Sequence, residues 1–405
     1  EAGEISCASS NLGAVTVVQG ETAKLFTTAI QAVSLSLDDT TTGAGSVQFG
    51  KKLTVTTLTN TADVASSDAV AIDFDIVFSE GIAVTSALTL STTGTVTLGS
   101  EAESECSFGA GLTHTAGTTH MAGVLSSSAD CALRDALLLN DVTFLAGTNT
   151  VSFARTVDGS SDDSSFALVF GNGTNATNVR FDGAVGSSRV PSLLTVWGNA
   201  AFGGSVSASG IITLKGGITA HSSDDVLLSG LYILADGNSS RTWRVSSGTL
   251  TCNDDMFINI AAASSVDIKG TITLKKKLCV YSGALSLSHS TLSVASDVVI
   301  FGSSYNADDP RFTGADTRFA YFGYENLAYT PADDVFAASL ASTAATIATG
   351  GNLYINGADV TGFAFELPDN AAAHPEFNAS AAVTETQWGT PYAVVFNASV
   401  AQSSA

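Results

Sequence analysis

Two stretches of this sequence, 60 residues apart, carry the same pattern without a gap. The first reads Ser205-Val206, Gly210 and Ile212-Thr213-Leu214-Lys215, and the second reads Ser265-Val266, Gly270 and Ile272-Thr273-Leu274-Lys275. A third copy with the same spacing lies between them: Val226, Gly230, Tyr232 and Leu234. A short apolar strand that returns about every 20 residues is typical of a solenoid, because each repeat needs its neighbours to bury its apolar face. The pattern therefore predicts stacked coils rather than a compact enzyme domain.

The repeats alternate apolar residues with Ser or Thr. Because successive side chains of a strand point to opposite faces, Ile212 and Leu214 are predicted to face the interior and Thr213 to face water. Crossovers between parallel strands are right-handed in nearly all proteins. The sequence thus predicts an all-β fold, a right-handed parallel β-helix. A shared corner, with a positive φ or a close approach of two coils, is predicted for three glycines: Gly210, Gly230 and Gly270.

Charge is scarce in this chain. Of its 405 residues 45% are hydrophobic and only 13% are charged, and the net charge of −22 reflects 16 Lys and Arg against 38 Asp and Glu. Nucleic-acid binding needs clustered cations, and the single basic run, Lys275-Lys276-Lys277, is interpreted as a solvated turn. No stretch reaches the roughly 20 apolar residues of a membrane span. The composition therefore argues against a nucleic-acid partner and against a membrane span.

The repeat divides the chain into three predicted regions. Residues 1–50 hold two alternating apolar runs and are predicted to form a strand pair or cap. Residues 51–302 are predicted to form the β-solenoid, with an excursion from the coil at about 100–140. Residues 303–405 lose the pattern and gain aromatic residues, which predicts a separate β-rich assembly or cap domain.

Part of the repeat region resembles a known family. The stretch Val179-Arg-Phe-Asp-Gly-Ala-Val-Gly186 and the segments 193–196, 201–206 and 210–214 resemble the repeats of filamentous-haemagglutinin and autotransporter-passenger β-helix surface proteins. The resemblance implies an extracellular rod that displays binding loops, and it brings no catalytic residues with it. Residues 1–50 and 303–405 do not match the pattern.

The five cysteines form no CxxC motif, so a zinc ribbon is not indicated. Cys106 and Cys131, like Cys252 and Cys279, are separated by close to one coil, so each pair is predicted to join adjacent coils by a disulfide. Cys7 is left over, either free or bonded between subunits. Five buried thiols are the alternative.

Five sequons offer sites for N-glycosylation. They begin at Asn172, Asn175, Asn238, Asn378 and Asn397. In a chain so rich in Ser and Thr this number is expected by chance, so their count alone is no evidence for sugars.

Metal binding has weak support in the sequence. Acidic pairs recur at predicted turns and could hold Ca²⁺, although none matches an EF-hand loop; they are Asp38-Asp39, Asp162-Asp163, Asp224-Asp225, Asp254-Asp255 and Asp308-Asp309. His114 and His120 lie near Cys106 but lack a third ligand of known geometry. We therefore expect no metal site and no cofactor, with Ca²⁺ as the alternative.

These observations favour a secreted, extracellular or cell-surface structural protein rather than an enzyme. The expected function is a β-solenoid subunit of a surface filament, appendage or coat, which self-assembles with copies of itself through its terminal regions. One alternative is a monomeric bacterial adhesin rod that binds host glycans or proteins. A second is a polysaccharide-active β-helix enzyme.

Overall fold

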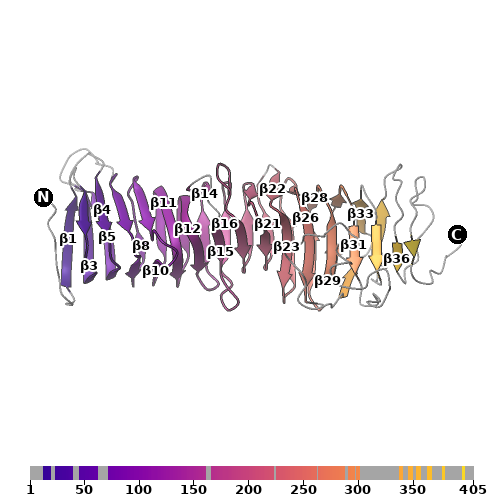
Figure 1. The fold of residues 1–405 in the computed structure, drawn as a ribbon, viewed down its shortest axis with the longest axis horizontal. Coiled ribbons are helices and arrows are strands. Elements are labelled where there is room, and N and C mark those ends of the chain that lie inside the picture. The colour runs from indigo at the N-terminus through magenta and orange to yellow at the C-terminus, as the bar shows by residue number, and fades with distance from the viewer. Residues whose placement is uncertain are drawn as a thin grey trace. The chain divides into compact units, whose positions relative to one another are not determined.

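A computed structural model of the chain describes most of its residues (Figure 1). The described ranges are 12–19, 23–39, 45–62, 72–160, 166–222, 225–261, 263–287, 291–296 and 298–301, with six later strands between residues 337 and 396. The protein is an all-β parallel β-solenoid of about 11 turns, and none of the described residues is helical. Strand pairing defines a 30-stranded and a 7-stranded sheet. The predicted all-β parallel solenoid is confirmed.

The chain divides into two compact units. The first consists of Glu1–Ser222 with Ser229–Leu231, and the second of Ser223–Leu228 with Tyr232–Ala405. The strands up to residue 222 are β1 (Leu12–Gln19), β2 (Lys24–Phe26), β3 (Ile30–Asp39), β4 (Ser46–Phe49), β5 (Leu53–Ala62), β6 (Asp75–Phe78), β7 (Ile82–Val84), β8 (Leu88–Thr89), β9 (Thr95–Leu98), β10 (Glu105–Phe108), β11 (Leu112–Ser127), β12 (Cys131–Leu145), β13 (Thr150–Phe153), β14 (Val157–Gly159), β15 (Ala167–Phe170), β16 (Asn178–Phe181), β17 (Leu193–Val196), β18 (Ala200–Phe202), β19 (Val206–Ser207), β20 (Ile212–Leu214) and β21 (Ile218–Ala220).

The later strands are β22 (Val226–Ser229), β23 (Tyr232–Gly237), β24 (Arg241–Val245), β25 (Leu250–Cys252), β26 (Asp255–Ile260), β27 (Ser265–Lys269), β28 (Thr271–Leu274), β29 (Leu278–Leu287), β30 (Thr291–Val294), β31 (Val298–Phe301), β32 (Ala337–Leu340), β33 (Ala345–Thr349), β34 (Leu353–Asn356), β35 (Phe363–Glu366), β36 (Glu376–Asn378) and β37 (Val395–Phe396).

Each coil of the first unit has three faces, and β11 shows this most directly. This single 16-residue strand pairs in order with β8, β9 and β10, and its register shifts between His114 and Thr118 and between Met121 and Gly123 mark the two corners. β12 follows the same path and pairs with β13, β14 and β15. One continuous strand therefore makes a complete turn.

Ladders of phenylalanine pack in the interior of the first unit. In each ladder, phenylalanines at equivalent positions of successive coils stack on one another. On one face Phe26, Phe49 and Phe78 stack with ring centroids 5.0 and 5.4 Å apart. Another ladder contains Phe153, Phe181 and Phe202, with centroids 5.4 and 6.2 Å apart. The parallel register aligns these residues as Cα partners, so the stacking follows directly from the repeat.

The second unit also has three strands per coil, and its interior is more varied. One face stacks Val226, Leu250, Ile272 and Leu292 in register. A second aligns Leu234, Phe257 and Cys279, and a third aligns Trp243, Ile268 and Leu287. Ile272 and Leu274, which occupy the same places in the repeat as Ile212 and Leu214, are fully buried.

The two matching stretches, 60 residues apart in the sequence, lie on different faces of the coil. Val206 in β19 belongs to the 7-stranded sheet, whereas Val266, its sequence match in β27, belongs to the 30-stranded sheet. Ile212 in β20 and Ile272 in β28 show the reverse assignment. The two stretches therefore do not share one register, because each coil contains three similar strand–turn units and a sequence match can align one face with another.

The glycine corner is correspondingly split. A Cβ on Gly230 would lie 2.7 Å from the carbonyl oxygen of Gly210, so these two glycines occupy one corner in successive coils. Gly270, with φ +106°, lies at another corner, where a Cβ would meet the carbonyl oxygen of Val245 at 2.6 Å. The predicted close approach of coils is confirmed at all three residues, but the shared position holds only for the first two.

The predicted region boundaries differ from the observed strand pairing. β1, β3 and β5 form one continuous parallel ladder, so residues 12–39 belong to the solenoid rather than to a distinct cap. The expected excursion at about 100–140 is the coil of β11 and β12 itself. After residue 303, β32, β33 and β34 continue the ladders of β29, β30 and β31 in parallel. These described strands therefore extend the solenoid of the second unit.

Candidate functional site: open strand edges

The first described strand leaves one side of its backbone open. β1 pairs along its length with β3, and no described strand pairs with its other side. The shorter β2 pairs in the same one-sided way with β4. A row of free backbone N–H and C=O groups is a template on which another strand can add.

The sequence of β1 lacks the usual protection of such an edge. Its eight residues, Leu-Gly-Ala-Val-Thr-Val-Val-Gln, include no charge and no proline, although natural edges commonly carry Lys, Pro or a bulge that blocks pairing. Nearby, the side chains of Leu25 and Val33 are 46% and 56% exposed. The edge is therefore both open and apolar among the described residues.

The last described strands form a second open edge, which lies in the second unit. β34 pairs with β36, β36 pairs with β37, and no described strand pairs with the other side of β37. All these pairings are parallel. Like β1, the free side of β37 offers backbone groups on which a further strand can add.

The cysteines do not form the predicted disulfides. Cys106, Cys131, Cys252 and Cys279 are buried and none of them is in a disulfide, while Cys7 lies outside the described residues. The ladder partners of the first pair are Leu125 for Cys106 and Leu112 and Val151 for Cys131.

A spacing close to one coil did not suffice to predict a disulfide, because coil lengths vary and only residues that are register partners come into contact. Burial raises the pKa of the Cys106 and Cys252 thiols to about 12. They are therefore poor nucleophiles.

The sequons fall into different environments. Asn172 and Asn238 are exposed, and Thr174 Oγ1 donates to Asn172 Oδ1 at 3.0 Å. Asn175 is half-buried and accepts at Oδ1 from Thr177 Oγ1 at 2.7 Å. Nothing is described for the side chains of Asn378 and Asn397. Glycosylation at any of these asparagines stays a prediction.

The two histidines lie on opposite faces of β11. His114 is completely buried, with Nδ1 2.8 Å from Thr119 Oγ1 and Nε2 3.1 Å from the carbonyl oxygen of Thr92. His120 faces outward and is half-buried. Burial lowers the pKa of both imidazoles. Both ring nitrogens of His114 already have partners, so this residue acts as a core hydrogen-bonding group.

Described acidic and amide side chains at the corners fasten one coil to the next. The backbone N–H of a residue in the following coil donates to an Oδ1 at 2.7–3.0 Å in pairs that include Thr95–Asp75, Thr150–Asp130, Ala167–Asp141, Asn199–Asn178, Gly217–Asn199, Thr249–Asp225 and Lys277–Asp255. We call these contacts corner staples. They give Asp225 and Asp255, two residues of the predicted acidic pairs, a structural role. Sequence reasoning missed this role, whose signal is an Asp or Asn recurring at corners.

The predicted acidic pairs and histidines do not gather into a cation site among the described residues. Among the described residues no group of three or more His, Cys, Asp or Glu side chains has a metal-binding arrangement. Of the predicted Asp pairs, Asp162-Asp163 and Asp308-Asp309 lie outside the described residues. Asp254 pairs with Lys276, Oδ1 to Nζ 2.7 Å. In the acidic hollow near Ser104, Glu80 and Glu105 pair with Lys51 and Lys52.

No described helix is long and apolar enough to cross a membrane.

The fold and its edges define the chain as a parallel β-solenoid with open strand edges. The chain matches no protein-family model, no curated protein and no solved structure. The comparisons thus add no family to the fold.

Proposed function

We propose that this chain is an extracellular structural protein that assembles with copies of itself into a surface filament, appendage or coat. The observation that carries the proposal is the uncharged eight-residue edge of β1, which no described strand covers. The resemblance of residues 179–214 to filamentous-haemagglutinin and autotransporter-passenger repeats belongs to the same proposal and supports a surface location.

Assembly would proceed by parallel strand addition. The terminal strand of one copy adds to β1 of the next, and each main-chain hydrogen bond formed contributes about 1 kcal/mol net. Contacts that join unlike ends do not close on themselves unless a rotation brings them into a ring, so they generate fibres. The apolar side chains of Leu25 and Val33 beside the edge add buried area to the contact.

The test compares variants of the full chain at the edge strand β1 and at β5, a strand that lies further inside the ladder. Ala14→Lys combined with Thr16→Lys places two charges on exposed positions of β1, while Thr59→Lys places one in the same outward ladder two strands further in. Sedimentation velocity and electron microscopy should show concentration-dependent filaments for the wild type and T59K, and monomers for A14K/T16K. Uniform monomers of the wild type at high concentration, or unchanged assembly of A14K/T16K, would contradict the proposal.

A further inference from the structure

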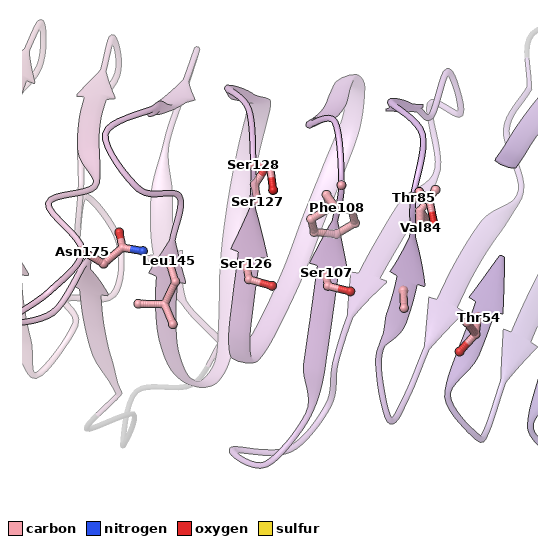
Figure 2. A pocket seen from close by; sticks show the side chains of 12 residues that line it. Thr54, Val84, Thr85, Ser107, Phe108, Ser126, Ser127, Ser128, Leu145 and Asn175 are labelled. Atoms are coloured by element: carbon pink, nitrogen blue, oxygen red, sulfur yellow. The ribbon is translucent and has the colours of Figure 1, made fainter. Parts of the chain in front are cut away.

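A groove crosses the outer surface of the first unit. It has a volume of about 500 Å³, which lies within the range of sites that bind small molecules. Its floor is one outward-facing ladder, Thr54, Ala83, Ser107 and Ser126, contributed in register by β5, β7, β10 and β11 (Figure 2). The hollow thus follows from four small side chains at the same position of four successive coils.

The groove ends where the ladder changes character. Ser126 pairs with Leu145 of β12, a larger side chain, and the loop at residues 171–177 brings Asn175 beside it. Figure 2 shows the carboxamide nitrogen of Asn175 directed toward Leu145. Residues about 120 positions apart in the sequence therefore line one hollow, from Thr54 to Asn175.

Asn175 is held in this position by buried contacts. Thr177 is completely buried, and its Oγ1 accepts from the backbone N–H of Ala146 at 2.8 Å and donates to Asn175 Oδ1 at 2.7 Å. The loop closes through two backbone bonds between Asn172 and Asn175, 2.8 and 3.1 Å long. Because Oδ1 is engaged, the amide Nδ2 remains available as a donor, and it has no partner among the described residues.

The groove also carries hydroxyl groups that the protein does not use. The side chains of Thr54, Thr85, Ser107 and Ser128 line it, and none of these hydroxyls has a hydrogen-bond partner within the described part of the chain. A hydroxyl both donates and accepts. None of the twelve lining residues is charged, in a chain whose net charge is −22.

This chemistry selects one class of ligand. The absence of charge from the groove lining removes the attraction that phosphates, nucleic acids or acidic sugars would need. The floor strands are paired in the ladder, so a peptide cannot add to them as a further strand. The lining also offers no exposed aromatic or Arg anchor of the kind that dominates protein interfaces. We propose that this groove binds a neutral oligosaccharide, whose hydroxyls pair with those of the floor and with Asn175 Nδ2.

Titration of the full chain with neutral hexasaccharides of glucose, mannose and N-acetylglucosamine tests the site. Separate titrations with hexagalacturonate and with an uncharged extended decapeptide test the two alternative ligand classes, acidic sugars and peptides. We expect at least one neutral hexasaccharide to bind with a Kd of roughly 0.1–1 mM by calorimetry. Ala83→Gln combined with Ser107→Gln fills the floor and should weaken binding at least about tenfold. Asn175→Ala should weaken it about fivefold through one lost hydrogen bond.

Thr213→Gln is the matched control, because Thr213 also faces outward from a paired strand but lies outside the groove. It should leave the Kd within about twofold of the wild type. All substituted groups lie on the outer face, and an unchanged thermal unfolding transition checks the fold. The proposal is overturned if no neutral hexasaccharide binds, if A83Q/S107Q leaves binding unchanged, or if hexagalacturonate or the peptide binds in preference. This test reports on sugar binding alone, so its outcome is independent of whether the chain assembles.

Discussion

The interiors of the two units solve the same packing problem differently. The first unit repeats phenylalanine above phenylalanine, as in Phe153, Phe181 and Phe202. The described part of the second unit mixes residue types along its ladders, and its described aromatic contact is the edge-to-face pair of Tyr232 and Phe257 at 5.1 Å. Stacked aromatic pairs contribute about 0.5–1.5 kcal/mol beyond the burial of their area. The aromatic ladders therefore give the first unit a stabilising contact that the described mixed ladders of the second unit largely lack.

The mixed interior of the second unit also contains polar groups. Arg241 is only 6% exposed, and burial lowers its pKa. Its guanidinium donates to the carbonyl oxygens of Asp236 and Ser239 at 2.8 and 3.0 Å. Trp243 is fully buried, yet its Nε1–H has no partner among the described residues. The Trp243 Nε1–H lowers the gain from burial, because a buried donor without a partner costs about 1–3 kcal/mol.

The largest expected effect tests whether the second unit nonetheless keeps a defined register. Ile272 is fully buried, whereas the adjacent Thr273 is partly exposed. Ile272→Asp should lower the free energy of unfolding by about 5 kcal/mol, because it places an uncompensated charge inside the ladder. Thr273→Asp should change it by less than about 0.5 kcal/mol. Chemical denaturation of both variants measures the difference, and equal tolerance would mean that this unit lacks a fixed inner face.

The next effect compares aromatic ladders with mixed ones directly. Phe181→Ala should cost about 4 kcal/mol and Phe257→Ala about 3 kcal/mol, since both rings are fully buried. The difference of about 1 kcal/mol reflects the additional ring contacts of Phe181 with Phe153 and Phe202. Calorimetric unfolding of the two variants provides the measurement. A larger loss at Phe257 would show that ring stacking does not distinguish the two interiors.

The strand content and inner faces could be predicted from the sequence because they depend on local alternation. Ile212 and Leu214 were assigned to the interior from the pattern Ile-Thr-Leu, and both are buried. The stacking of coils could not be predicted in the same way, since it depends on which residues become partners across variable corners. For this reason the sequence match of Ile212 with Ile272 did not place them on the same face, and the spacing of Cys106 and Cys131 did not make them partners in a disulfide.

The candidate edge and groove illustrate the same division. The alternating run in β1 predicted a strand, but only the pairing reveals that one of its sides is open. The groove depends on Thr54, Ala83, Ser107 and Ser126 lying in one ladder, and no spacing in the sequence marks them because their coils differ in length. Asn175 joins them from a loop whose position is fixed by tertiary contacts.

Corner staples should contribute equally to the stability of both units. They therefore serve as a control for the comparison of the two interiors. In the first unit Asn178 Oδ1 accepts from the backbone N–H of Asn199 at 2.7 Å, and in the second Asp255 Oδ1 accepts from that of Lys277 at 3.0 Å. Asn178→Ala and Asp255→Ala should each cost about 1 kcal/mol. Asp255→Asn keeps the acceptor and should be nearly neutral in the same denaturation assay. A loss confined to one unit would indicate that the corners, and not only the ladders, differ between them.

The smallest expected effect is a pH dependence from the first unit, because the described residues of the second contain no histidine. Burial lowers the pKa of His114 and of His120, so the unfolded chain binds protons at a higher pH than the folded chain does. The corresponding stability is complete above the unfolded pKa of about 6.5 and is lost as the pH falls below it.

Thermal unfolding followed between about pH 7 and 5 should show this loss for the wild type. The loss should be reduced in H114Q and reduced further in H114Q/H120Q. If the double variant keeps the full slope in this window, protonation of these imidazoles does not destabilise the coil of β11, and the first unit owes its pH dependence to its carboxylates instead.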